Sequence, residues 1–132
     1  MSRYLLDTNV CIEFFKRHAK VASKLENLES GSLFISEITL VELRIGALKS
    51  VRPDFHNGVI ADLLDDLTVL PISAALDLFI QEKVRLSRSG TMVDNFDLLI
   101  GATAIHHDLT LVTNNTMHFQ RLEGIKMEDW TK

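Results

Sequence analysis

The stretch Arg3-Tyr4-Leu5-Leu6-Asp7-Thr8-Asn9 decides the fold of this 132-residue chain. Residues 3–6 predict a short buried strand, and Asp7 ends it. The residues that follow Asp7 continue in a helical pattern as far as Phe15. A buried strand that leads directly into a helix is typical of a parallel α/β sheet, and such sheets bind ligands just beyond the carboxyl ends of their strands.

Outward from this stretch, short apolar strands alternate with helices along the sequence. The other expected strands cover residues 33–35, 68–72, 109–113 and 125–127, the last at an edge of the sheet. The expected helices cover residues 8–15, 18–28, 37–52, 54–67, 73–90, 97–107 and 116–122, with Ser36 and Ser73 as caps and Gly90 as a stop. This order predicts a single α/β domain over residues 1–132, with a mainly parallel sheet covered on both faces.

Composition supports a folded protein with a real core. Hydrophobic residues make up 46% of the chain, and only two prolines and six glycines occur, which argues against disorder. The apolar run at the N-terminus is too short for a signal peptide, and no stretch approaches the length of a membrane span, so a cytoplasmic protein is expected. The single Cys11 excludes an internal disulfide and a cysteine-based metal site, and it is expected to be a buried thiol.

The net charge of −4, from 14 basic and 18 acidic side chains, does not favour a nucleic-acid enzyme. Two observations weaken that objection. Carboxylates that bind a divalent cation no longer count as free negative charge. The basic residues also cluster locally, although solvated helix faces explain each cluster equally well. The clusters are Lys16, Arg17 and Lys20; Arg44, Lys49 and Arg52; and Lys83, Arg85 and Arg88.

Polar residues gather where the strands are expected to end. Asp7 follows the first strand, and Asn114 and Asn115 follow the strand that ends at Thr113. Because the carboxyl ends of parallel strands meet at one edge, these residues are expected to lie together. The sequence therefore directs attention to the acids that the neighbouring helices bring to this edge.

Two helices add acids to this set. Glu42 lies beside Ile38 and Ile45 near the predicted core face of its helix, where a carboxylate is costly unless it is paired or binds metal. The apolar series on this helix is Ile38, Val41, Ile45 and Leu48, and a similar series, Leu76, Phe79, Ile80 and Val84, marks the helix at 73–90. Asp97 begins another helix, where an acid also suits the helix dipole.

Taken together, the acids form a hard-oxygen site that contains no cysteine and requires no histidine. Such a site suits Mg²⁺, or Mn²⁺ as the alternative, and is used for phosphodiester hydrolysis by metal-activated water. Asp94 is expected to cap its helix rather than to bind the ion. Gly101, one turn after Asp97, indicates the close approach of a backbone or ligand, or simply tight packing.

Four motifs in register resemble the PIN-domain toxins called VapC, and the resemblance runs along essentially the whole chain. Any one of the motifs is weak, but their shared order is specific. The tail, with Phe119, Arg121 and Gly124 before Glu128-Asp129-Trp130, also resembles that family. The motifs are Leu5-Leu6-Asp7-Thr8-Asn9, Ile35-Ser36-Glu37-Ile38-Thr39-Leu40-Val41-Glu42-Leu43, Asp97-Leu98-Leu99-Ile100-Gly101-Ala102 and Leu111-Val112-Thr113-Asn114-Asn115.

The resemblance implies a PIN-like three-layer α/β/α sandwich, a homodimer and a VapB-type antitoxin partner in a bacterial type II toxin–antitoxin pair. It also implies a metal-dependent endoribonuclease that cleaves structured RNA, either transfer or ribosomal RNA. Residue by residue, Asp7, Glu42 and Asp97 match the family's metal-binding acids, and Asn9 and Thr113 match supporting positions. Many PIN domains place a fourth catalytic acid where this chain has Asn115, so the number of metal ions, one or two, stays open.

Other functions predict different residues. A receiver-like phosphoacceptor domain would have paired acids after the first strand and an aspartate at the end of the third. A phosphatase with an aspartyl nucleophile would have an acid two residues after Asp7, where Asn9 stands. A non-catalytic RNA-binding or scaffold module on the same fold is the remaining alternative, and the intact acidic set argues against it.

Overall fold

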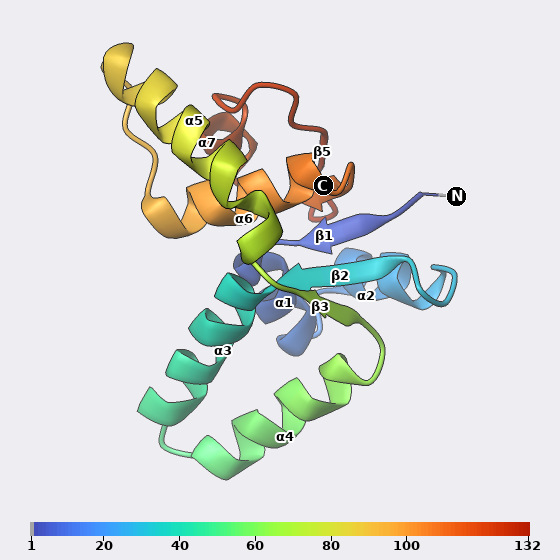
Figure 1. The fold of residues 1–132 in the computed structure, drawn as a ribbon. Helices are drawn as coiled ribbons and strands as arrows, with labels where there is room; N and C mark the ends of the chain where they lie inside the picture. The colour runs from blue at the N-terminus through green and yellow to red at the C-terminus, as the bar shows by residue number, and fades with distance from the viewer. Residues whose placement is uncertain (1) are drawn as a thin grey trace.

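The computed structural model describes residues 2–132, which form five strands and seven α-helices in regular alternation (Figure 1). The strands are β1 Tyr4–Leu6, β2 Leu33–Ser36, β3 Thr68–Leu70, β4 Thr110–Val112 and β5 Met127–Glu128. The helices are α1 Thr8–Phe15, α2 Ala19–Glu26, α3 Glu37–Lys49, α4 Pro53–Leu64, α5 Leu76–Arg88, α6 Asn95–His106 and α7 Thr116–Phe119, with a 3₁₀ turn at Ser73–Ala75 before α5. Each strand and α-helix overlaps its predicted range, but some bounds are wrong: β3 ends at Leu70 and not at residue 72, α7 ends at Phe119 and not at residue 122, and β5 begins at Met127 and not at residue 125.

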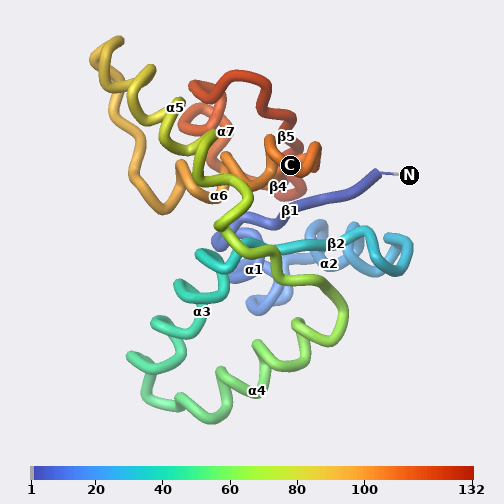
Figure 2. Tube along the Cα trace, viewed as in Figure 1, coloured from blue at the N-terminus to red at the C-terminus, as the bar shows by residue number. Residues whose placement is uncertain are grey.

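The five strands form one parallel sheet in the order β3-β2-β1-β4-β5, with β1 at its centre. Helices α5, α6 and α7 cover one face, and α1 to α4 lie on the other, as the tube trace shows (Figure 2). The predicted α/β/α sandwich with a parallel sheet is therefore confirmed. Within residues 2–132, none of the helices is both long and apolar enough to cross a membrane.

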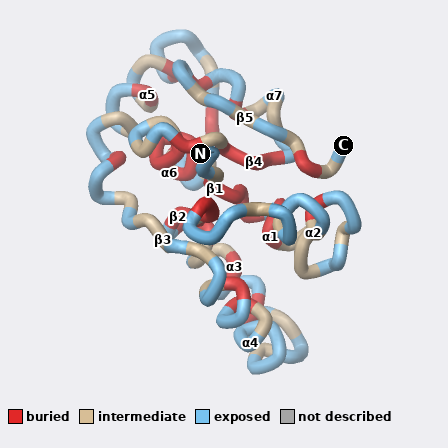
Figure 3. Tube along the Cα trace, turned by 90° about the vertical axis from the view of Figure 1, so that its right-hand side faces the viewer, coloured by how far each residue is buried: buried red, intermediate tan, exposed pale blue. Residues whose placement is uncertain are grey.

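The core consists of two clusters, one on each face of the sheet, and neighbouring residues of β1 pack into different clusters. Leu5 packs in the cluster under α5, α6 and α7, whereas Leu6 packs in the cluster with α1 to α4. Alternate side chains of a strand point to opposite faces, so a strand buried on both sides is apolar at every position. The central strands are accordingly the most buried part of the chain (Figure 3). Cys11 is fully buried beside Leu6, and burial raises the pKa of its thiol to about 12, as expected for an inert thiol.

The caps of the helices only partly follow the prediction. Ser36 caps α3 through its side chain, and Gly90 follows the end of α5 with a φ of 72°. Ser73 does not cap α5, because it begins the 3₁₀ turn and the capping position falls on Ala75, which offers no side-chain acceptor. Pro71 ends β3 directly after Leu70, since a proline has no N–H for the sheet ladder.

Most of the apolar residues that the sequence groups on α3 and α5 lie outside the core. Helix α3 buries Ile38, Leu43 and Ala47, but it leaves the other apolar residues of its predicted series exposed. Helix α5 buries Leu86 and, unexpectedly, Glu82, whose carboxylate is paired with Arg85. The exposed residues are Val41, Ile45 and Leu48 on α3, and Leu76, Ile80 and Val84 on α5.

Gly101 lets the segment after α7 approach α6 closely. A Cβ atom built on Gly101 would overlap the Leu122 side chain and touch the ring of Phe119. The sequence left open a ligand or tight packing at this glycine, and the structure shows packing. Leu122 and Phe119 are both buried, so neither has free space into which it could withdraw.

Gly101→Ala is expected to destabilise the protein by about 1–3 kcal/mol, the usual cost of overpacking a core. Gly46→Ala on α3 is the matched control, because nothing lies within 4 Å of a Cβ built there. That substitution should stabilise the helix by roughly 0.5–1 kcal/mol. Urea unfolding of both variants measures the contrast, and two variants of equal stability would contradict the packing argument.

Candidate active site

Asp7 stands at the centre of the carboxyl edge of the sheet. It follows β1, caps α1, and accepts a hydrogen bond of 2.8 Å from the backbone N–H of Thr8 on Oδ1. Thr113, directly after the neighbouring β4, donates its hydroxyl to Asp7 Oδ2 at 2.9 Å. Both oxygens of this carboxylate are therefore oriented by neutral donors.

Burial makes Asp7 an unusual acid. Only 4% of the residue is exposed, and its pKa is raised from 3.8 to about 6, chiefly by desolvation. The negative charges of Asp97 and Glu42 contribute to this rise, and the hydrogen bonds from Thr113 and Thr8 oppose it. Repulsion between the neighbouring acids therefore contributes to the raised pKa of Asp7. Loss of hydration on burial is the larger cause of that rise.

Glu42 reaches the same place from α3. The hydroxyl of Thr8 donates to Glu42 Oε1 at 2.7 Å, and Thr8 Oγ1 also lies 3.1 Å from Thr39 Oγ1. Thr8 therefore links Asp7, through its backbone, to Glu42, through its side chain. Glu42 is half-buried, and because Ile45 on the same helix is 46% exposed, it lies at the border of the core and not within it.

Asp97 arrives from the first turn of α6. Asp94 caps that helix by accepting hydrogen bonds from the N–H groups of Phe96 and Asp97, as the sequence predicts. The side chain of Asp97 faces α7, where His118 Nε2 lies 3.2 Å from Asp97 Oδ2. Partial burial raises the pKa of the Asp97 carboxyl, and the proximity of His118 opposes that rise.

The two asparagines take less part in this arrangement. Asn9 is exposed on α1, and its side chain has no hydrogen bond within residues 2–132. Asn115 lies at the same edge, where its backbone N–H donates to Thr113 Oγ1 at 3.0 Å, but its side chain is exposed. His118 was not singled out from the sequence, because only the fold brings α7 beside Asp97.

The chemistry of the acids fits a divalent metal ion. Carboxylate oxygens are the ligands that Mg²⁺ and Mn²⁺ prefer. Three carboxylates lie at this edge of the sheet, and the charges of Asp97 and Glu42 contribute to the raised pKa of Asp7. Across residues 2–132, no three acid, histidine or cysteine side chains are arranged to enclose an ion. Glu42 is turned toward Thr8 and Asp97 toward His118, so the site suits an ion bound by one or two carboxylates and retained waters.

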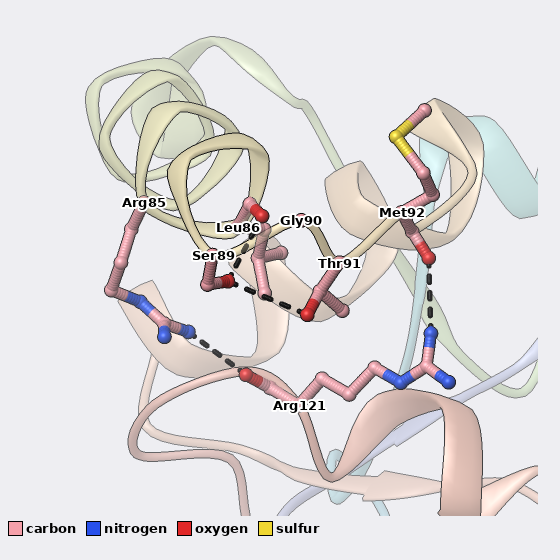
Figure 4. Close-up of a pocket in the computed structure, with 7 residues that line it drawn as sticks. All are labelled: Arg85, Leu86, Ser89, Gly90, Thr91, Met92 and Arg121. Atoms are coloured by element: carbon pink, nitrogen blue, oxygen red, sulfur yellow. Dashed lines mark hydrogen bonds between the residues drawn. The ribbon is translucent and has the colours of Figure 1, made fainter.

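A pocket of about 560 Å³ lies between the end of α5, the loop that follows it and Arg121. Figure 4 shows Arg121 Nη1 donating to the Met92 carbonyl at 3.0 Å, and Arg85 Nη2 donating to the Arg121 carbonyl at 2.8 Å. Arg85 also forms a bidentate pair with Glu82 at 2.9 and 2.7 Å. These contacts tie the segment that leads to Asp94 and Asp97 to the chain after α7.

A parallel α/β sheet with acids at its carboxyl edge, and Asn9 where an aspartyl phosphatase would have its second acid, fits the class of metal-dependent nucleases. Residues 4–125 match the PIN domain family. The tRNA(fMet)-specific endonuclease VapC of Shigella flexneri is 37% identical over 132 residues, which cover 99% of this chain and 100% of that protein. Ribonuclease VapC2 of Haemophilus influenzae is 37% identical over 133 residues, with 98% of this chain and 99% of that protein covered.

The fold agrees with these relatives. The crystal structure of DNA-bound VapBC from Salmonella typhimurium contains a chain that is 36% identical, with a TM-score of 0.91 and 98% of this chain and 99% of that chain covered. VapBC2 from Rickettsia felis follows at a TM-score of 0.88 and 32% identity, over 96% and 98% of the two chains. The chain belongs to the PIN domain family, among its VapC ribonucleases. It is therefore a nuclease of a family that acts with a divalent metal ion.

Asp7→Asn is expected to stabilise the metal-free protein at pH 7.5, by up to about 3 kcal/mol for a pKa raised by two units. Because the folded state raises this pKa from 3.8 to about 6, the stability that protonated Asp7 contributes is complete below pH 3.8 and is lost as the pH rises through 6. The gain of the variant over the wild type should therefore be largest at pH 7.5 and disappear at about pH 3. Thermal melts across this range measure it.

Glu29→Gln, which neutralises an exposed acid in the turn between α2 and β2, is the control and should leave the melting temperature nearly unchanged. Millimolar Mn²⁺ should raise the melting temperature of the wild type but not that of Asp7→Asn, since binding to the folded state stabilises it. A wild-type melt that Mn²⁺ does not move would contradict a metal site at this edge.

Proposed function

We propose that residues 1–132 form a single PIN domain that acts as the toxin of a type II toxin–antitoxin pair, cleaving structured RNA as a Mg²⁺-dependent endoribonuclease. Mn²⁺ is the alternative ion. The observation that carries the proposal is the buried Asp7 carboxylate, oriented by Thr8 and Thr113 and surrounded by Glu42 and Asp97. Transfer RNA is the favoured substrate, because the Shigella flexneri relative is named for cleavage of tRNA(fMet).

Each acid has a distinct part in this proposal. Asp7 and Asp97 hold the ion, and Glu42, fixed at Oε1 by Thr8, uses its other oxygen to orient the attacking water. When bound, the ion supplies Lewis acidity that activates water and neutralises charge on the phosphate. Thr113 keeps the Asp7 carboxylate in place, and the exposed Asn115 and Asn9, each two residues after one of this pair, are assigned to contacts with the substrate. No side chain serves as a nucleophile.

A VapB-type antitoxin is the proposed partner, since the Salmonella typhimurium and Rickettsia felis structures are VapBC complexes. A groove of about 620 Å³ between α1, α2 and α4 offers a surface for it. Phe14, Phe15 and Phe55 line this groove, and Asp62 and Asp66 lie at it as well. Aromatic side chains beside acids suit a segment that carries both apolar and basic residues.

The protein is also proposed to form a homodimer through the exposed apolar stripes of α3 and α5. Ile45 on α3 is 46% exposed and Ile80 on α5 is 55% exposed. The opposite sides of both helices pack against the core. Burial of such residues from water at a second copy is favourable, at about 25 cal/mol per Å² of apolar surface. Apolar patches of this kind mark interaction surfaces.

Ile45→Lys is expected to weaken the dimer at least tenfold, because it places a charge in the apolar contact. Sedimentation over a range of protein concentrations measures the dissociation constant. Met117→Lys, at an apolar position that is 76% exposed on α7, is the control and should leave the dimer intact. A wild-type protein that is monomeric at every concentration would contradict the dimer.

The decisive test incubates the pure protein with total transfer and ribosomal RNA in the presence of Mg²⁺, Mn²⁺ or EDTA. Cleavage should require the ion and should leave 5′-phosphate and 3′-hydroxyl ends, since water and not the 2′-hydroxyl attacks. Asp7→Asn should abolish cleavage while it preserves the fold. Cleavage in EDTA, or cyclic-phosphate ends, would refute the mechanism, and RNA that is bound but never cut would favour a non-catalytic RNA-binding module.

A further inference from the structure

His118 makes a contact with Asp97 that the proposed roles do not use. Its Nε2 atom lies 3.2 Å from Asp97 Oδ2, and this nitrogen is buried. Within residues 2–132, no group forms a hydrogen bond of good geometry with Nε2, Asp97 included, and Asp97 Oδ2 is its one polar neighbour at ion-pair distance. The ring also packs edge-on against Phe119, with centroids 5.7 Å apart.

We propose that His118 is a positioning residue for Asp97: the contact of Nε2 with Oδ2 holds the carboxylate in place and leaves Oδ1 for the metal ion. Within residues 2–132, Oδ1 has no hydrogen bond or ion pair. The inference rests on the proposed function, because it assigns Asp97 to the ion. It completes a pattern in which each acid has a polar neighbour of its own: the hydroxyl of Thr113 for Asp7, the hydroxyl of Thr8 for Glu42 and the imidazole of His118 for Asp97.

The fold places His118 for this contact through Gly101. Asp97 and Gly101 are one turn apart on α6, and His118 and Leu122 are four residues apart in the segment that packs against them. The Leu122 side chain occupies the space where a Cβ of residue 101 would stand. The missing side chain lets the two segments approach, and this approach brings Nε2 of His118 to Asp97.

An imidazole suits this position better than a lysine or an arginine would. A permanent cation beside Asp97 would neutralise the carboxylate and compete with the metal ion for it. An imidazole carries no permanent charge, so it can hold the oxygen in place without taking up the charge that the metal ion needs. Donors that orient metal-binding carboxylates typically contribute 10- to 100-fold to metal affinity.

The test compares His118→Ala and His118→Gln with the wild type by calorimetric titration of Mn²⁺ into the metal-free full-length protein. His118→Ala should bind Mn²⁺ about 10- to 100-fold more weakly. His118→Gln should recover most of that loss, because the amide nitrogen of glutamine can reach the position of Nε2. Met117→Ala, at an exposed neighbouring position, should bind as the wild type does. The melting temperature of each metal-free variant reports whether the fold is retained.

Three results would overturn the role of His118: wild-type or tighter Mn²⁺ affinity in His118→Ala, equal loss in His118→Ala and His118→Gln, or equal loss in Met117→Ala. Asp97→Asn separates this failure from that of the proposed function. Binding lost in Asp97→Asn but kept in His118→Ala contradicts only the positioning role. A wild-type protein that binds no Mn²⁺ contradicts the metal site itself, and with it the inference.

Discussion

The buried carboxylate of Asp7 is the constraint on which the rest of the structure depends. It ends the central strand, caps α1, and accepts the hydroxyl of Thr113 from the next strand, so one side chain joins three elements. A carboxylate this deeply buried is costly unless its oxygens find donors. The geometry of the sheet edge follows from that requirement, because β1, β4 and α1 must meet where the donors can reach both oxygens.

The donors that reach Asp7 and Glu42 are neutral, and this choice has a chemical consequence. Within residues 2–132, no lysine or arginine lies at ion-pair distance from Asp7, Glu42 or Asp97, and the ion pairs of Arg85 and Lys126 lie elsewhere. A basic partner would relieve the repulsion and lower the pKa values, but it would also occupy the charge that a cation needs. Hydroxyl and backbone donors orient the carboxylates and leave that charge available to a metal ion.

The sequence predicts the location of the acids well, because strand ends and helix starts are local features. Asp7 and Asp97 follow from that reasoning, and so does the capping role of Asp94. Glu42 follows from a different local feature, its place beside Ile38 and Ile45 on one face of its helix. The contacts made by the side chains do not follow, because they depend on how distant helices pack. His118 is an example: nothing near it in the chain predicts Asp97 as its neighbour. Likewise, crowding of acids predicts the raised pKa of Asp7, but only the fold shows that burial is the larger cause.

The helices α3 and α5 show the limit of periodicity most clearly. A helical pattern of apolar residues shows that a face is hidden from water, and it cannot distinguish a protein core from a surface covered by another molecule. Helix α3 has apolar residues on its buried face and on its exposed face. Leu43 and Ala47 pack in the core, whereas Ile45 and Leu48 are exposed on the surface. Glu42 lies between them, at the border of the core. Because α3 carries an acid of the candidate site on one side and an exposed apolar stripe on the other, any molecule that covers this stripe lies one turn of helix from Glu42.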